Sequence, residues 1–250
     1  MEIPLTRKHL AHRMTNILWI LSHLRRITSE SLLRVSPTEF ANYFRKVRPY
    51  TMCSSARLRG LYRAARHVVE SRIPGDVVEC GVARGGSAAL VSLVLRDLGS
   101  EKSVWGFDTF EGMPSPTLQD PDYEIASLYT GTCRGTVEEV KGNLQTLGIL
   151  ERFRFVQGRF EDTLPETKVG PIALLHIDGD WYSSVKACLD HLYDRVSPGG
   201  VIQLDDYGFW QGAEKATDEF LSKRNLPRNL IKLDYSGRQI WKSASMSASS

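Results

Sequence analysis

Residues 76–87 read DVVECGVARGGS, and they determine how the rest of the chain is interpreted. Residues 76–80 form a short, apolar, β-branched run, and glycines follow at positions 81, 85 and 86. The next residues, AALVSLVLRDL, have the apolar spacing of a helix. A strand, a glycine-rich turn and a helix bring backbone close to a nucleotide-like ligand, because glycine lacks a Cβ and a helix N-terminus offers free N–H groups. The stretch therefore predicts an α/β fold with a ligand at this turn.

The spacing of the glycines differs from that of a dinucleotide fingerprint. The turn reads G-V-A-R-G-G rather than G-x-G-x-x-G, and Glu79 stands before the first glycine. A carboxylate there repels a pyrophosphate but can accept a hydrogen bond from an ammonium group. The pattern resembles the first motif of S-adenosylmethionine (SAM) methyltransferases more than a nicotinamide site. A glycine turn without a ligand is the alternative interpretation.

Length and composition indicate a single globular protein. A chain of 250 residues with 42% hydrophobic residues can bury a sizeable core. The net charge of +3 is small and no basic, aromatic stripe is present, so we expect no nucleic-acid partner. No apolar run approaches the roughly 18 residues of a membrane span. Four scattered cysteines without a C-x-x-C pair are typical of a reduced, cytoplasmic protein.

The N-terminus resembles a targeting signal, because the basic run TRKHLAHR precedes the apolar run MTNILWILSHL. It has no small-residue cleavage site, however, and Arg25 and Arg26 follow directly. The apolar residues at helical spacing are Leu10, Met14, Ile17, Leu18, Leu21 and Leu24. We expect an amphipathic helix that packs on the core or on a second subunit, and hence a homodimer.

The first 75 residues are predicted to form a helical cap. One helix should start with Ser36 as its cap, Pro37 in its first turn and Glu39 completing a capping box. It should end near residues 48–49, and after a loop a second helix should run to about residue 72. Residues 76–242 form the predicted core, and residues 243–250 a disordered tail.

From residue 76 onward strands and helices alternate, which predicts a mostly parallel sheet covered on both faces. Strands are expected at residues 76–80, 103–108, 153–157, 172–178 and 201–205, followed by a closing hairpin at 230–233 and 239–241. One helix should follow the glycine turn and end near residue 98, and two others should cover residues 182–196 and 214–224. Residues 113–136 contain three prolines among apolar residues. We interpret this segment as a lid on the acceptor side of the site, and a disordered insertion is the alternative.

Acids follow several of these strands. Asp108 ends the second strand, where an acid can accept the hydroxyls of a ribose, although capping a helix would also explain it. The loop after the third strand, residues 158–162, is placed to touch an adenine. A plain turn is the alternative there.

Three further acids, Asp178, Asp205 and Asp206, follow the fourth and fifth strands. Neighbouring strands lie about 4.8 Å apart, so these carboxylates should meet at the ligand-binding edge. Clustered carboxylates repel one another and favour a cation, and ligation by oxygen alone favours Mg²⁺. Capping and solvation of each acid is the alternative. We interpret Asp180 as a helix cap and His176 as structural.

Six runs occur in a fixed order: YTM (50–52), GDVVECGVARGGS (75–87), FDTFEGMP (107–114), FEDTLP (160–165), LLHIDGDWYSS (174–184) and SPGGVIQLDDYG (197–208). Together they resemble the macrocin O-methyltransferase (TylF) family. The resemblance implies a class I SAM-methyltransferase (Rossmann-like) fold, with a seven-stranded, mostly parallel sheet and an N-terminal helical cap. It also implies SAM- and Mg²⁺-dependent methylation of sugar hydroxyls on glycosylated natural products such as antibiotics.

The resemblance also implies roles for individual residues. Asp178, Asp205 and Asp206 would hold the metal, and Asp178 would also be the catalytic base. The residues that would line SAM are Thr51, Met52, Glu79, Gly81, Val82, Gly85, Gly86, Ser87, Asp108, Thr109, Phe110, Phe160 and Glu161.

Two other functions remain open at this point. Catechol methyltransferases are similar but place a lysine base three residues after the first metal aspartate, where this chain has Trp181. A catechol or phenol methyltransferase is one alternative, and a non-catalytic SAM-binding partner is the other. The motifs leave open which sugar and hydroxyl are methylated, and whether the acceptor is a nucleotide sugar or a finished glycoside.

Overall fold

The structure, a computed structural model, describes residues 30–243. The amphipathic helix predicted at residues 10–24 lies outside the described residues, as does the predicted tail apart from Ser243. Within residues 30–243 no helix is both long and apolar enough to cross a membrane. The four cysteines are free thiols.

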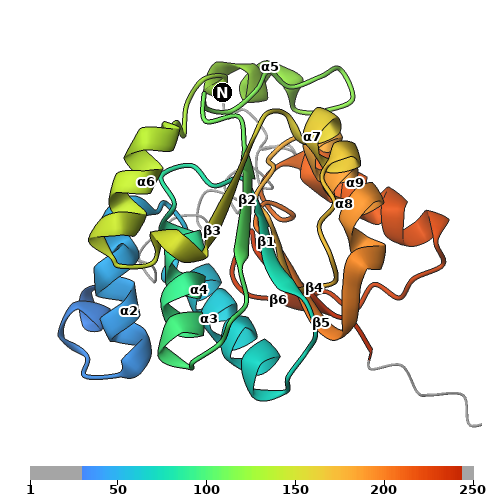
Figure 1. Cartoon of the computed structure of the whole chain (residues 1–250). Helices are drawn as coiled ribbons and strands as arrows, with labels where there is room; N and C mark the ends of the chain where they lie inside the picture. The colour runs from blue at the N-terminus through green and yellow to red at the C-terminus, as the bar shows by residue number, and fades with distance from the viewer. Residues whose placement is uncertain (1–29, 244–250) are drawn as a thin grey trace, which may run out of the picture.

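A seven-stranded sheet with the order β3-β2-β1-β4-β5-β7-β6 forms the centre of the molecule (Figure 1). Its strands are β1 (Asp76–Cys80), β2 (Val104–Asp108), β3 (Phe153–Gln157), β4 (Ile172–Ile177), β5 (Val196–Leu204), β6 (Ile231–Lys232) and β7 (Arg238–Trp241). The first five pair in parallel, whereas β7 pairs antiparallel with β5 and β6 antiparallel with β7. The prediction of a seven-stranded, mostly parallel sheet is confirmed, and β4 and β5 are neighbours.

The largest difference from a predicted strand boundary is at the start of β5, and the other strand ends differ by one residue at most. β5 begins at Val196 rather than at residue 201, and the preceding helix is correspondingly shorter. Val196 pairs with Ile172, and the register between β4 and β5 shifts between Ile172 and Leu174. Residues 198–200, which the sequence marks as a turn, are therefore carried within the strand as an irregularity.

Helices cover both faces of the sheet. They are α2 (Glu39–Val47), α3 (Ser55–Glu70), α4 (Gly86–Asp97), α6 (Val137–Thr146), α7 (Phe160–Glu166), α8 (Tyr182–Leu192) and α9 (Gln211–Lys223), with short 3₁₀ turns η1 (Arg48–Tyr50), η3 (Leu150–Arg152) and η4 (Tyr193–Arg195). Figure 1 shows α2, α3, α4 and α6 on one side and α7, α8 and α9 on the other. Alternation along β1 explains the two cores, because Val77 packs with the first group and Val78 with the second.

The start of α2 lies two residues later than predicted. Thr38 is its N-cap, and its hydroxyl accepts a hydrogen bond from the backbone N–H of Ala41 at 3.4 Å. The Ser36 hydroxyl instead accepts a bond from the backbone N–H of Thr38 at 3.4 Å, so Ser36 lies outside the helix. Glu39 does not complete a capping box; its carboxylate accepts bonds from Tyr62 and Arg66 of α3.

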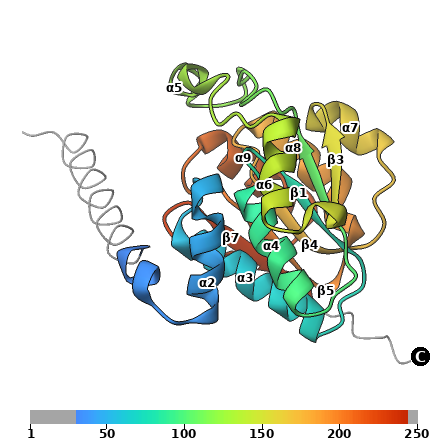
Figure 2. The ribbon, with the colours of Figure 1, turned by 60° about the vertical axis from the view of Figure 1, so that its left-hand side comes forward.

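Residues 113–136 fold over one end of the sheet and include α5 (Tyr123–Ala126) and η2 (Ser127–Tyr129). Figures 1 and 2 show α5 at the top of the molecule, apart from the two helical layers. Asp120, only 2% exposed, accepts a 2.7 Å hydrogen bond from the backbone N–H of Tyr182 at the start of α8. The indole N–H of Trp181 donates to the carbonyl of Pro114 at 2.7 Å. The segment is thus tied to the N-terminus of α8.

Candidate active site

A cavity of about 570 Å³ lies at the carboxyl ends of β1, β2, β4 and β5. Most of the residues predicted to bind the methyl donor or the metal line it. They are Thr51, Met52, Gly81, Val82, Gly86, Ser87, Asp108, Thr109, Phe160, Glu161, Asp178, Asp205 and Asp206. The structure brings these residues together from seven segments of the chain. Glu79, Gly85 and Phe110, which were predicted with them, are not among the residues that line the cavity.

Close contacts within the chain require two of the glycines in the turn after β1. Gly81 has a φ of +96°, and a Cβ there would lie 1.9 Å from the carbonyl oxygen of Asp178. A Cβ at Gly86 would lie 2.6 Å from the Cβ of Thr51. The turn can therefore bring the end of β4 and the loop around Thr51 to the edge of the cavity only with glycine at these positions.

Asp108 fixes the same turn from the end of β2. Its Oδ2 accepts hydrogen bonds from the backbone N–H groups of Val82 at 2.7 Å and Ala83 at 2.9 Å. Its Oδ1 accepts one from Phe110 at 2.7 Å. Each carboxylate oxygen has two lone pairs, so Oδ1 of Asp108 can accept a further hydrogen bond while the carboxylate holds the loop.

Glu79 is buried behind the cavity, with 2% of its surface exposed. Its Oε1 lies 2.7 Å from Nδ1 of His176. Its other oxygen, Oε2, is buried and has no hydrogen-bond partner among the described residues. His176, which the sequence marks as structural, is buried as well and links β1 to β4.

Four acids line one end of the cavity rather than the three that were predicted together. Asp178, Asp180 and Asp206 each offer a carboxylate oxygen, and these atoms lie within 4.8 Å of one another. A second group consists of Cys53, Asp178 and Asp205, with the same spacing. Asp178 belongs to both groups and joins them.

The electrostatics of these acids separate Asp205 from the others. Burial, together with the neighbouring carboxylates, raises the pKa of Asp178 and Asp180 well above the usual range. Burial and Asp205 raise the pKa of Asp206 to about 6. Burial also acts to raise the pKa of Asp205, but Arg57 and His176 outweigh it, so that this pKa is lowered.

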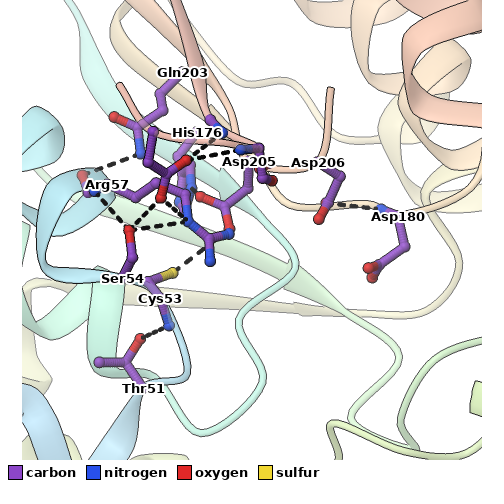
Figure 3. A network of polar contacts seen from close by, with 12 residues as sticks. Thr51, Cys53, Ser54, Arg57, His176, Asp180, Gln203, Asp205 and Asp206 are labelled. Atoms are coloured by element: carbon purple, nitrogen blue, oxygen red, sulfur yellow. Dashed lines mark hydrogen bonds and ion pairs between the residues drawn. The ribbon is translucent and has the colours of Figure 1, made fainter. Parts of the chain in front are cut away.

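The side chain of Asp205 is surrounded by donors of the protein itself (Figure 3). The guanidinium of Arg57, from α3, forms an ion pair with its Oδ2, and the thiol of Cys53 donates to the same oxygen at 3.7 Å. Nε2 of His176 lies 3.4 Å from Oδ1. Asp205 thus has a cationic partner already, whereas Asp178, Asp180 and Asp206 form an acidic group that has no ion pair with any residue of the range 30–243.

Asp180 is not the helix cap that was predicted. Trp181 is the N-cap of α8, and the backbone N–H of Tyr182 donates to Asp120 instead. Asp180 has a φ of +56°, its N–H donates to Asp206 Oδ2 at 3.2 Å, and its Oδ1 accepts a bond from the indole N–H of Trp210 at 3.0 Å. Figure 3 shows the backbone N–H of Asp180 facing the carboxylate of Asp206. The repeated acid in D-G-D, 178–180, is the sequence signal that could have indicated this position, which the interpretation as a cap missed.

The donor set of this acidic group fits a hard divalent cation. Its ligand atoms are carboxylate oxygens, which Mg²⁺ prefers, and the raised pKa values reflect burial together with repulsion between the carboxylates, which a cation would relieve. The nearby thiol of Cys53 belongs to the group around Asp205, and burial raises its pKa well above the usual range.

The sheet order, the glycine turn and the acids at the carboxyl edge define a class I O-methyltransferase. The sequence profile described as Macrocin-O-methyltransferase (TylF) matches residues 38–242, and the chain belongs to that family. The predictions of family, fold class and enzyme class are confirmed.

Three similar proteins are named as O-methyltransferases. The 8-demethyl-8-(2,3-dimethoxy-alpha-L-rhamnosyl)-tetracenomycin-C 4'-O-methyltransferase of Streptomyces olivaceus is 34% identical over 206 residues, which cover 80% of this chain and 78% of that protein. The demethyldecarbamoylnovobiocin O-methyltransferase of Streptomyces niveus is 34% identical over 196 residues, covering 75% and 74%. The mycinamicin III 3''-O-methyltransferase of Micromonospora griseorubida is 30% identical over 198 residues, covering 75% and 76%.

A similar solved structure is that of the O-methyltransferase NovP. It has a TM-score of 0.72 and 32% identity, and the match covers 78% of this chain and 82% of that one. The calicheamicin methyltransferase CalS11, at 19% identity and a TM-score of 0.61, shares the fold.

Proposed function

We propose that this protein transfers the methyl group of SAM to a hydroxyl of a sugar, and that it does so with Mg²⁺. The acceptor would be a deoxysugar carried by a glycosylated natural product or by a nucleotide. The observation that carries the proposal is the acidic group of Asp178, Asp180 and Asp206 beside the glycine turn, in one cavity.

The named relatives support the sugar as acceptor. One is a 4'-O-methyltransferase of a rhamnosyl tetracenomycin, and another is a 3''-O-methyltransferase of mycinamicin III. Because the methylated positions differ between relatives of similar identity, the resemblance supports the class of acceptor and not the particular hydroxyl.

The two ends of the cavity would have different tasks. The turn after β1, Asp108 and the start of α7 would bind SAM, and the acids after β4 and β5 would bind the acceptor. Methyl transfer from a sulfonium is an in-line displacement, so the first task of these residues is alignment. Holding two reactants in register can lower a barrier by about 7–11 kcal/mol at best.

The second task is to take a proton from a weakly acidic hydroxyl. Asp178 would be the base, since it belongs to both groups of ligand atoms and lines the cavity. Asp178, Asp206 and the newly found Asp180 would hold Mg²⁺, with Asp205 beside them, fixed by Arg57 and His176. Mg²⁺, when bound, would lower the pKa of a neighbouring hydroxyl and favour the ionised form of the carboxylates.

The position of Trp181 argues against a catechol methyltransferase. It stands where those enzymes, which this chain resembles distantly, place a lysine base. Here the side chain is 1% exposed, and its indole N–H is bonded to Pro114. Trp181 therefore contributes to the anchoring of residues 113–136 and supplies no base.

A methylation assay with a matched variant tests the proposal. We expect S-adenosylhomocysteine to form from SAM and p-nitrophenyl glycosides of 6-deoxyhexoses in the presence of Mg²⁺, and to stop forming after EDTA treatment. Asp178→Asn should abolish turnover and leave the SAM dissociation constant, measured by calorimetry, within about twofold. Full activity in EDTA or in Asp178→Asn would refute the metal and base assignments, and a preference for catechol would favour the other enzyme class.

A further inference from the structure

Three aromatic rings border the acidic group, and the mechanism above uses none of them. Tyr129 comes from η2 in the segment 113–136, whereas Phe209 and Trp210 lie between β5 and α9. The ring centroids of Tyr129 and Trp210 are 5.2 Å apart and those of Phe209 and Trp210 are 4.8 Å apart, both edge to face. All three residues line the cavity, and we call them the aromatic triad.

The members of the triad differ in exposure. Trp210 is 6% exposed, but Phe209 is 48% and Tyr129 40% exposed. A large aromatic side chain that is left half uncovered beside a cavity gives up burial free energy, unless a ligand covers it. Phe209 and Tyr129 therefore offer apolar ring surface at the mouth of the site.

The buried ring of the triad is connected to the acids. The indole N–H of Trp210 donates to Oδ1 of Asp180 at 3.0 Å, and its own backbone N–H donates to the carbonyl of Asp206 at 3.0 Å. A second buried tryptophan, Trp181, packs on Trp210 with the centroids 4.9 Å apart but bonds to Pro114. Only one of these two indoles thus touches a carboxylate of the group.

A pyranose presents hydroxyls at its edge and C–H groups on its faces. Its hydroxyls suit carboxylates, and its C–H groups suit aromatic rings, whose faces carry partial negative charge. Ligand pockets commonly combine apolar and aromatic walls with a few polar groups that set orientation. The triad and the acidic group together have both kinds of surface for a sugar.

We propose that Phe209 and Tyr129 form the acceptor subsite, contacting the C–H face of the sugar and its apolar substituent. Trp210 is a positioning residue that holds one oxygen of Asp180, so that the other faces Asp178 and Asp206. The inference rests on the proposed function and adds the residues that select the acceptor. Tyr129 also joins the segment 113–136 to the site through the ring of Trp210.

The first experiment separates binding from chemistry, with p-nitrophenyl α-L-rhamnopyranoside as acceptor. Phe209→Ala and Tyr129→Ala should each raise its KM about fivefold to tenfold, which corresponds to the loss of one aromatic contact. Their kcat and their SAM dissociation constants should stay within about twofold. Leu128→Ala is the matched control, because Leu128 is 79% exposed in the same turn as Tyr129 but does not line the cavity. Its KM should be that of the wild type.

The second experiment tests Trp210. Trp210→Phe keeps an aromatic ring but removes the N–H, and it should lower kcat about tenfold or more, since a hydrogen bond to a charged group is lost. KM for the rhamnoside should change less than twofold. Trp181→Phe removes the other indole N–H and should lower kcat much less. As a measurement independent of activity, the indole N–H resonance of Trp210 should shift in Asp180→Asn more than that of Trp181.

Three outcomes would overturn the inference. One is an unchanged KM in both Phe209→Ala and Tyr129→Ala while the wild type methylates the rhamnoside. The second is an equal loss of kcat in Trp210→Phe and Trp181→Phe. The third is an indole N–H resonance of Trp210 that does not shift in Asp180→Asn. If the wild type methylates no glycoside at all, the proposed function is refuted, and the acceptor subsite, which rests on it, is refuted as well.

Discussion

Oε1 of Glu79 lies 2.7 Å from Nδ1 of His176, and both side chains are almost completely buried. The other nitrogen of this imidazole lies 3.4 Å from Asp205. Although burial acts against it, the hydrogen bonds to Asp205 and Glu79 raise the pKa of His176 to about 10. The buried side chain of His176 therefore connects the end of β1 with the residue that follows β5.

Removal of this imidazole should destabilise the protein strongly. His176→Ala leaves Glu79 without its partner and deprives Asp205 of one, and breaking a buried charged pair typically costs about 3–5 kcal/mol. Urea unfolding of the metal-free protein measures the loss. His191→Ala, at an exposed position in the last turn of α8, is the control and should cost less than about 1 kcal/mol. Equal losses in the two variants would contradict the connecting role of His176.

The same histidine should make the free energy of unfolding depend on pH in the neutral to alkaline range. Because its pKa is raised from 6.5 to about 10 on folding, its contribution is fully present below pH 6.5. It is lost as the pH rises toward 10, at a rate on the order of 1 kcal/mol per pH unit. The free energy of unfolding should therefore fall from pH 7 to pH 9, and fall less in His176→Gln. Parallel curves for the two proteins would show that His176 is neutral in the folded state.

Asp120 should fasten the segment 113–136 to the body of the protein. It is buried and caps α8 through the backbone N–H of Tyr182, and the loss of such a cap costs about 0.5–2 kcal/mol. We expect Asp120→Ala to lose this amount in urea unfolding and to speed proteolysis within residues 113–136. Glu124→Ala, at an exposed position in α5, should do neither. If residues 113–136 stay resistant to proteolysis in Asp120→Ala, the hydrogen bond between Trp181 and Pro114 is sufficient to anchor this segment.

The parts of the fold that follow from local pattern could be predicted from the sequence. The apolar runs at β1 and β4 mark strands because these central strands are buried on both faces. The meeting of Asp178 with Asp205 and Asp206 at one edge also follows, since β4 and β5 pair in parallel.

Partners that arrive from distant elements could not be predicted in this way. Arg57, on α3, pairs with Asp205 across 148 positions, and no spacing rule indicates it. Asp180 looks like a cap in sequence, because an acid before a helix usually is one. Only the structure shows that the buried Asp120, 62 positions from Tyr182, already accepts the hydrogen bond from the backbone N–H of Tyr182. Asp180 itself has a φ of +56° and lies among the other acids.

The acidic group should make the effect of Mg²⁺ on stability depend on pH. The pKa of Asp206 is raised from 3.8 to about 6 on folding, so its stabilising contribution is present below pH 3.8 and is lost as the pH rises through 6. Above pH 6 the metal-free protein holds an ionised Asp206 close to the charge of Asp205, and a cation that binds only the folded state adds stability. MgCl₂ should therefore raise the melting temperature more at pH 7.5 than at pH 5, relative to NaCl of equal ionic strength. Asp180→Asn should diminish this rise, whereas Asp162→Asn, at an exposed position in α7, should keep it. The same rise at both pH values, or in both variants, would place the ion elsewhere.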